Sequence, residues 1–165
     1  GGGLLDDRVD PLAEGAIVFR ECLQLWQDLP AAARQRILLV TLPLDDIEEN
    51  AATVNALQRH ASVIVQKSIA EGFGLTVAEG MWKGRPVIGS PVGGILDQIV
   101  EGTGVLLPDA RDLKGFGVAL CGLLDDPAGA DRIGRAAHES IRERYVGDLH
   151  LLRYASLFGT LLPDA

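Results

Sequence analysis

The sequence has few aromatic residues, two cysteines and no long apolar run, and each shortage excludes a class of protein. Aromatic residues make up 5% of the chain against 47% for all hydrophobic residues, so the expected core is aliphatic. Cys22 and Cys121 lack the spacing of a metal site, and we expect both to be reduced packing residues. No segment approaches the roughly 20 apolar residues of a membrane span.

A signal peptide is also lacking, and positive charge is scarce. The opening Gly1–Gly3 resembles a tag or linker remnant, and a cytoplasmic protein is expected. Lys and Arg total 15 against 23 for Asp and Glu, which gives a net charge of −8. This balance argues against nucleic acid or an anionic membrane as the main partner. At 165 residues the chain is long enough for one domain with a substantial core, and we expect a single domain over residues 1–165.

Short apolar runs bounded by turn residues predict four strands, and the 3.6-residue period predicts the helices between them. The strands are expected at 37–42, 63–65, 87–89 and 105–107. The helices are expected at 16–29, 31–36, about 45–60, about 75–83, 95–100, 113–124, 130–145 and 149–162, after a loop over 1–14. Strands separated by helices indicate βαβ units, so the fold class is α/β, a Rossmann-like parallel sheet with flanking helices.

The helical period also assigns buried faces. In the first helix the inward residues are expected to be Val18, Cys22, Leu25 and Trp26, and in the helix at 45–60 they are Ile47, Val54 and Leu57. Four acidic residues crowd the start of that second helix, where carboxylates favour the helix dipole: Asp45, Asp46, Glu48 and Glu49. Their spacing forms no ligand cage, so we expect a solvated helix start and no metal site.

The stretch 63–79 combines a strand, a glycine-punctuated loop and the start of a helix. Its first three residues are a β-branched run, typical of a parallel strand covered on both faces. Gly72 and Gly74 permit close backbone approach, and Ser68 or Thr76 could supply a capping hydroxyl. The helix would point its free N–H groups past the carboxyl edge of the sheet, where ligands bind in open α/β folds. The geometry suits a phosphate or another anion.

Charged side chains accompany this loop. Glu71 lies in the loop and Glu79 about one turn into the helix, where carboxylates can accept hydrogen bonds from ribose or sugar hydroxyls. Taken alone, the pair would be a capping carboxylate and an ordinary helical glutamate. Lys67, at the end of the strand, would otherwise be a surface lysine. A second glycine turn, Gly93–Gly94, follows the next strand and shares this edge if the two strands are parallel.

Residues 66–88 read Gln-Lys-Ser-Ile-Ala-Glu-Gly-Phe-Gly-Leu-Thr-Val-Ala-Glu-Gly-Met-Trp-Lys-Gly-Arg-Pro-Val-Ile, and Val92-Gly93-Gly94 follow. This run resembles the donor-binding motif of the group 1 (family 4) retaining glycosyltransferases, which have the GT-B architecture. The segments Gln66–Ser68, Trp82–Gly84 and Asn55–Arg59 are most similar to the trehalose-forming branch, which comprises glycosyltransferring trehalose synthase and trehalose phosphorylase. The resemblance therefore implies a C-terminal donor-binding domain.

The resemblance also implies roles for individual residues. Glu79 would accept the ribose hydroxyls of a nucleoside diphosphate-glucose, and Glu71 would lie at the transferred glucose. Lys67 would help to balance the charge of the diphosphate, and Leu42 would flank the base. Backbone groups of the two glycine turns would hold the sugar and the diphosphate, from Phe73, Gly74, Leu75, Thr76, Gly93 and Gly94. Glucose would move to a sugar acceptor with retained configuration, without a cofactor or a metal.

The chain departs from the family pattern at its N-terminal end. Residues 1–30 do not match the expected first strand and its Arg- and Lys-bearing loop, and the acceptor-binding N-terminal domain is missing. We therefore expect a fragment that lacks its first βα units, binds donor weakly and transfers no glucose by itself. Three alternatives remain open: trehalose phosphorylase, an epimerase of the same architecture, and a non-catalytic nucleotide-sugar binding module that self-associates through uncovered surface.

Overall fold

The computed structural model describes residues 11–42 and 45–161 of the chain. The chain divides into two compact units, residues 1–46 and residues 47–165. The tag-like Gly1–Gly3 lies outside the described residues. That all 165 residues form one domain stays a prediction.

The described part of the first unit contains the helices α1 (Pro11–Gln27) and α2 (Ala31–Arg34). The loop predicted for 1–14 is wrong for residues 11–14, which are helical, and the remainder lies outside the described residues. Proline is tolerated in the first turn of a helix because its missing N–H has no intrahelical partner there. The indole of Trp26 donates to the Ile37 carbonyl at 3.2 Å, and the Arg34 guanidinium lies over its ring at 5.6 Å. The rest of the predicted buried face of α1 is wrong, since these side chains are exposed: Val18, Cys22 and Leu25.

The strand predicted at 37–42 is absent, because these residues form neither a helix nor a strand. An apolar run shows that a segment favours an extended, buried conformation, but a strand exists only where a neighbouring strand completes its hydrogen-bond ladder. Within the described residues no strand pairs with this segment. Leu38 and Val40 are consequently 85% and 55% exposed.

The second unit is built on a parallel sheet whose described strands run in the order β1 (Ile64–Gln66), β2 (Val87–Gly89) and β3 (Val105–Leu106). Ile64 is opposite Val87, and Ile88 is opposite Val105. This confirms the α/β class with a parallel sheet. Three of the four predicted strands are present among the described residues.

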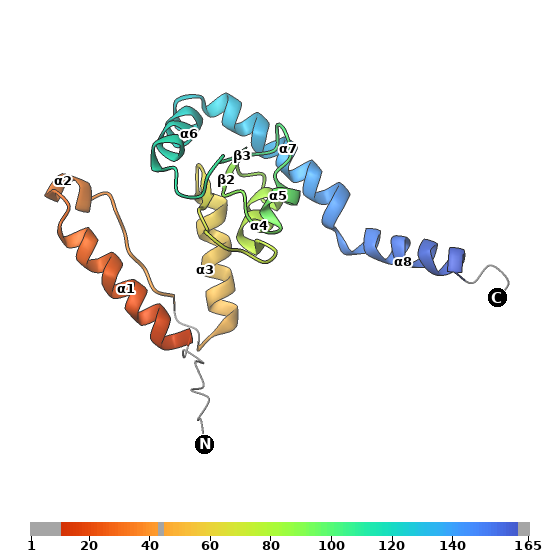
Figure 1. Ribbon diagram of the computed structural model, residues 1–165, viewed down its shortest axis with the longest axis horizontal. Coiled ribbons are helices and arrows are strands. Elements are labelled where there is room, and N and C mark those ends of the chain that lie inside the picture. Colours follow the sequence, from red (N-terminus) through yellow and green to blue (C-terminus); the bar gives the residue numbers. More distant parts are fainter. Residues whose placement is uncertain (1–10, 43–44, 162–165) are drawn as a thin grey trace, which may run out of the picture. The chain divides into compact units, whose positions relative to one another are not determined.

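Helices flank this sheet, as Figure 1 shows for the part coloured from yellow to blue. Their bounds are α3 (Ile47–His60), α4 (Leu75–Trp82), α5 (Ile95–Gln98), α6 (Leu113–Asp125), α7 (Pro127–Tyr145) and α8 (Gly147–Leu161). Side chains cap the starts of two of them. The carboxylates of Asp112 and Asp126 accept hydrogen bonds from the amides of Gly115 and Gly129, at 2.8 and 2.9 Å. Such caps satisfy amides that a helix start otherwise leaves free.

The core of the second unit lies on both faces of β2. Successive side chains of a strand point to opposite faces, and Val87 and Ile88 are both fully buried. Val87 packs in a cluster with α4, α5 and α7, whose members are Ile64, Val77, Met81, Ile95, Ile99, Ala137 and Ile141. Ile88 packs in a second cluster with Leu107, Leu123 and Ala130. The sheet is therefore covered on both faces at its centre.

Several predicted buried positions are exposed instead. Val65 in β1 is 37% exposed, so the expectation that this strand is covered on both faces is wrong; β1 is one of the two edge strands of the described sheet. In α3, Ile47 and Leu57 are 80% and 58% exposed, while Val54 is half-buried and Gln58 is buried. Cys22 and Cys121 are free thiols, as predicted, but both are exposed and neither is a packing residue.

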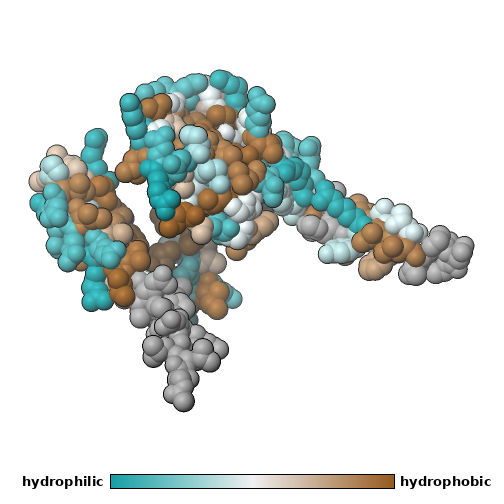
Figure 2. Space-filling view, viewed as in Figure 1, coloured by the Kyte–Doolittle hydropathy of each residue, from teal (hydrophilic) through white to brown (hydrophobic). Residues whose placement is uncertain are grey.

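Apolar side chains also lie along α8, where Figure 2 shows brown surface. Leu151, Leu152 and Phe158 are 71%, 67% and 57% exposed. No helix in the described ranges combines the length and the apolar character that crossing a membrane requires.

Candidate functional site

Two glycine turns meet at the carboxyl edge of the sheet. Residues 71–74 follow β1 and residues 91–94 follow β2, and parallel neighbouring strands end at the same edge. The Gly94 amide donates to the Gly72 carbonyl at 2.8 Å. A Cβ atom on Gly93 would lie 1.8 Å from the Glu71 carbonyl oxygen, and one on Gly94 would lie 2.5 Å from that of Phe73. The turns therefore pack backbone against backbone, with no room for a side chain between them.

The first turn leads into α4 through Gly74, which has φ +86° and caps the helix. The predicted hydroxyl cap is wrong: no side chain caps α4, and the Ser68 hydroxyl accepts instead from Gln66 Nε2 at 2.7 Å. Among the described residues, no group accepts a hydrogen bond from the amides of residues 73–76. These amides stand at the positive end of the helix dipole and are free for an anionic ligand.

Glu71 is a half-buried carboxylate held beside the first turn. Its Oε1 accepts from the Gly72 amide at 3.0 Å, and its Oε2 accepts from Gln66 Nε2 at 3.2 Å. Gln66 is the last residue of β1, so the strand fixes the direction of this carboxylate. One oxygen of the carboxylate thus faces the loop backbone and the other faces the strand end.

Glu79 lies one turn into α4 and is held by α3. Its Oε2 accepts from Gln58 Nε2 at 2.8 Å, and Gln58 Oε1 accepts from the ammonium group of Lys83 at 2.5 Å. Gln58 is 8% exposed, which makes it a fixed bridge between the two charged groups. Glu79 borders a groove of about 400 Å³ between these helices and a second, mainly apolar one of about 300 Å³ that includes Phe73.

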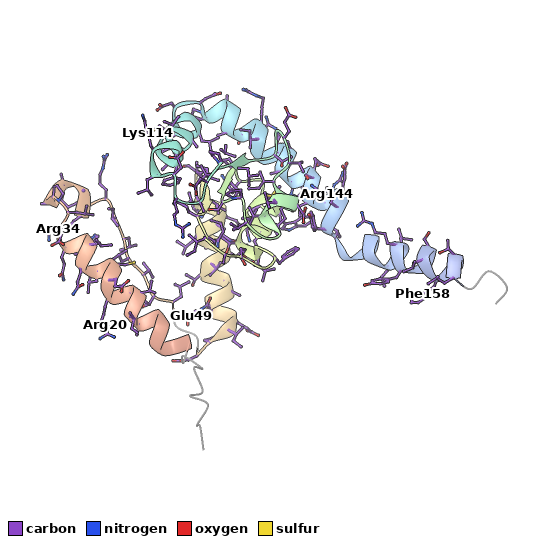
Figure 3. The ribbon with its side chains drawn as sticks, in the orientation of Figure 1. Arg20, Arg34, Glu49, Lys114, Arg144 and Phe158 are labelled. Atoms are coloured by element: carbon purple, nitrogen blue, oxygen red, sulfur yellow. The ribbon has the colours of Figure 1, made fainter. Side chains whose placement is uncertain are left out.

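The side chain of Phe73 is held by the end of α7. Its ring packs edge-on against Tyr145, with centroids 6.0 Å apart and an interplanar angle of 70°. Tyr145 and Arg144 both donate to the Asp97 carbonyl in α5, at 3.1 and 2.5 Å. Arg144, labelled in Figure 3, lies near the C-terminal end of α7. These contacts connect the first glycine turn and α5 with α7.

Not all predicted site residues come together. The Lys67 ammonium donates to the Ala110 carbonyl on the loop after β3, away from the two turns in sequence. Leu42 belongs to the first unit, whereas the glycine turns belong to the second. Glu71 and Glu79 flank α4's first turn with separate hydrogen-bond partners, and they share none of the described cavities. Leu75 is 67% exposed and Thr76 is half-buried at the start of the helix.

Three glutamines were missed as supports of the site: Gln58, Gln66 and Gln98. Gln66 opens the motif and Gln58 lies in the segment Asn55–Arg59, so the resemblance offered a signal for both. Gln98 reaches the site from α5, and its position does not stand out in the sequence. A buried glutamine on an otherwise apolar helix face is visible only once the fold is known.

A larger, basic cavity of about 790 Å³ lies at the other end of α4 and includes none of the predicted site residues. Its basic side chains are Arg59, His60, Lys83, Arg85, Arg135 and His138, and Glu139 also lines it. Arg59 and His60 occupy the last turn of α3, and Lys83 caps the end of α4, where cations favour the negative end of the dipole. Helix-end electrostatics therefore account for three of these basic residues. Within the described residues, no cluster of three or more His, Cys, Asp or Glu side chains is arranged for a metal ion.

Residues 37–126 match the family model described as glycosyl transferases group 1. This chain belongs to the group 1 glycosyltransferases. The match covers the strands, both glycine turns and α4, and it confirms the resemblance carried by residues 66–88. The trehalose synthase of Pyrococcus horikoshii is 45% identical over 113 residues, which are 68% of this chain. That stretch is 26% of the synthase, so this glycosyltransferase chain spans about a quarter of its relative's length.

Solved glycosyltransferase structures share the fold. Sucrose-phosphate synthase from Thermosynechococcus elongatus matches with a TM-score of 0.70 and 28% identity, over 99% of this chain and 38% of its own. Anabaena HepE, solved in complex with UDP-glucose, matches with a TM-score of 0.54 and 19% identity, over 65% of this chain and 30% of its own. The second likeness is one of fold alone.

Proposed function

We propose that this chain is the donor-binding domain of a retaining glucosyltransferase that moves glucose from a nucleoside diphosphate-glucose to a sugar acceptor. The acceptor would be glucose and the product trehalose. One observation carries the proposal: the amides of residues 73–76 are free at the start of α4, at the carboxyl edge of a parallel sheet. Free amides at a helix start bind phosphate, and this edge is the ligand site of open α/β folds.

The donor's diphosphate would lie against these amides and the second glycine turn. The backbone groups involved belong to Phe73, Gly74, Leu75, Thr76, Gly93 and Gly94. Because the chain carries a net charge of −8, the phosphates must be held by local dipoles rather than by the overall field. The tight packing of the two turns supports this assignment, since glycine lets the two backbones lie close enough together to border the same ligand.

The two glutamates would hold the neutral parts of the donor. Glu79 Oε2 is engaged by Gln58, which leaves the other oxygen to accept from ribose hydroxyls. Glu71, oriented by Gln66, would accept from hydroxyls of the transferred glucose near the reacting face. Carboxylates suit both tasks because each oxygen accepts hydrogen bonds from hydroxyl groups.

Two further predicted residues have weaker support. Lys67 would balance diphosphate charge only after leaving the Ala110 carbonyl, to which its ammonium group donates. Leu42 would flank the base, as the resemblance implies, but it belongs to the first unit, whereas the glycine turns belong to the second. Neither residue is needed for the diphosphate contacts proposed above.

The chemical role of the domain would be electrostatic stabilisation and positioning. As the glycosidic bond to the diphosphate breaks, negative charge grows on the leaving phosphate, and amide donors fixed beforehand stabilise that charge without reorganising. The acceptor would have to be presented by a separate N-terminal domain. A curated relative at 45% identity is a trehalose synthase, which supports the trehalose synthase reaction over that of trehalose phosphorylase.

Other partners and the location also belong to the proposal. HepE binds UDP-glucose in a related fold, which supports a nucleotide-sugar donor here. Free thiols at Cys22 and Cys121 suit the reducing cytoplasm, where we place the protein. The exposed apolar residues of α8 offer a surface for the N-terminal domain or for a second copy of the chain.

The proposal is tested by calorimetric titration of the chain with UDP-, ADP- and GDP-glucose. We expect one of the three to bind, and Glu79→Gln to weaken it roughly tenfold, because a charged acceptor is worth about 1.5–3 kcal/mol. Glu101→Gln is the matched control, since Glu101 is exposed in the turn before β3, at the opposite edge of the sheet. Absence of binding by all three donors, or equal losses in the two variants, would contradict the proposal.

A further inference from the structure

Gln98 is a buried amide side chain beside the first glycine turn. It is the last residue of α5, its exposed fraction is zero, and its Nε2 donates to the Phe73 carbonyl at 2.6 Å. Its Oε1 is buried and has no hydrogen-bond partner. A Cβ atom on Gly74 would lie 3.7 Å from that oxygen, so the amide group of Gln98 borders both residues of the Phe73–Gly74 peptide.

This burial is costly for a residue with a purely structural task. A buried polar atom without a partner destabilises a protein, and methionine would fill a similar volume without any polar atom. The surrounding residues are aliphatic, since Ile95 and Ile99 of the same segment are 0% and 5% exposed. Among the described contacts of Gln98, the hydrogen bond to the Phe73 carbonyl is thus the one that an apolar side chain of similar size could not make.

The hydrogen bond from Gln98 fixes the orientation of the whole Phe73–Gly74 peptide unit and not only that of the Phe73 carbonyl. A peptide unit is planar and trans, so the Phe73 carbonyl and the Gly74 N–H point in opposite directions from the same plane. Holding the carbonyl against the buried amide of Gln98 therefore aims the Gly74 N–H in the direction opposite to Gln98. Gly74 has φ +86° and no Cβ, which makes rotation of this plane easy when nothing holds it. The Gly74 amide is one of the donors without an acceptor in the described residues.

We infer that Gln98 is a positioning residue of the donor site, whose hydrogen bond to the Phe73 carbonyl directs the Gly74 amide at the donor's diphosphate. The inference rests on the proposed function and adds a residue from outside the recognised motif. It predicts that the hydrogen bond made by Gln98 strengthens binding of the diphosphate and does not affect binding of the base or the ribose. The ribose contact of Glu79 depends on Gln58 in α3 instead.

The test compares Gln98→Met with Thr103→Val in the same chain. Thr103 is a matched control because it is buried, its hydroxyl bonds to the backbone of Val100, and it does not touch the glycine turns. Each variant is titrated by NMR with a nucleoside diphosphate and with the corresponding nucleoside, for the base that the wild type prefers. We expect Gln98→Met to bind the diphosphate roughly tenfold more weakly and the nucleoside unchanged. Thr103→Val should leave both affinities unchanged.

A second readout needs no ligand. The amide chemical shift of Gly74 in the free protein reports the orientation of its peptide plane, and we expect Gln98→Met to move it while Thr103→Val does not. In the wild type, a scalar coupling across the hydrogen bond from Gln98 Nε2 to the Phe73 carbonyl carbon should be detectable. This measurement keeps the inference testable if Gln98→Met and a second variant, Gln98→Leu, both fail to fold.

The outcomes separate this inference from the proposed function. If the wild type binds the diphosphate and Gln98→Met binds it equally well, the inference is overturned while the proposed function stands. If the wild type binds no nucleotide, the proposed function fails and the role in donor binding fails with it. An unchanged Gly74 shift in Gln98→Met, or a missing coupling in the wild type, overturns the geometric basis in either case.

Discussion

Gly93 is the residue at which the two glycine turns come closest. It has φ +51°, and a Cβ atom there would lie 1.8 Å from the Glu71 carbonyl oxygen. We expect Gly93→Ala to lower the free energy of unfolding by more than about 2 kcal/mol, because left-handed strain and a clash with backbone act together. Urea denaturation measures this change. The separated turns should also lose donor affinity in calorimetry.

Gly102→Ala separates the two causes. Gly102 also has a positive φ, of +81°, but a Cβ atom on it would meet nothing within 4 Å. Strain alone should cost about 1–2 kcal/mol there and leave donor affinity unchanged. Equal destabilisation by the two variants would show that the turns tolerate separation, against the close packing described for the site.

At this scale, the sequence predicted residues that are neighbours in the chain and missed those that meet only in the fold. The glycine turns, Glu71 and Glu79 follow from the strand–loop–helix pattern, because that pattern fixes their positions within two successive βα units. Gln58 and Gln98 come from α3 and α5, and the local sequence does not show that either side chain is buried against the site. Lys67 lies in the motif and was predicted to contact the diphosphate, but its ammonium group donates to the Ala110 carbonyl, a contact that the local sequence does not reveal.

At the scale of elements, α7 depends on a cap at its first turn. Asp126 Oδ1 accepts from the Gly129 amide at 2.9 Å, and Pro127 follows at the first helical position. We expect Asp126→Ala to lower the free energy of unfolding by about 1 kcal/mol, the usual cost of losing such a cap. Thermal and urea unfolding both measure it. Donor affinity should not change, because the site borders the opposite end of α7.

Asp126→Asn tests whether the cap or the charge matters. Asparagine keeps a capping oxygen but loses the pair with Arg132, which is 3.7 Å long and exposed on both sides. Exposed pairs of this kind contribute about 0–1 kcal/mol, so we expect stability close to wild type. A loss as large as that of Asp126→Ala would contradict the capping explanation.

Elements were predicted well where local and tertiary signals agree. β2 has the predicted bounds, and α4 ends within a residue of its predicted end, because Gly84 and Pro86 stop a helix whatever surrounds it. The segment 37–42 has an equally apolar sequence but no pairing strand in the described residues, so its prediction failed. Most of the predicted inward residues of α1 and α3 are exposed, although Trp26 and Val54 are half-buried, since periodicity shows which face is apolar but not whether anything covers it.

At the scale of the whole molecule, the proposed function assigns the chain one part of the transfer reaction, the holding of the donor. It spans 26% of the trehalose synthase that it matches, and the proposed donor contacts all lie on one sheet edge of the second unit apart from Leu42. Transfer needs the acceptor hydroxyl held near the anomeric carbon, and that positioning can supply 7–11 kcal/mol of a reaction barrier, as an order of magnitude. A domain that holds the donor alone therefore binds substrate without accelerating the transfer.

We accordingly expect this chain, incubated with its nucleoside diphosphate-glucose and glucose, to form no trehalose while an NMR titration shows weak donor binding. Chromatography of the products over many hours measures the transfer. Glu71→Ala, purified in the same way, identifies any contaminating enzyme, because a contaminant would act equally in both preparations. Trehalose formed by the wild-type chain and lost in Glu71→Ala would mean that these 165 residues position an acceptor by themselves, and the proposed division between donor and acceptor domains would fail.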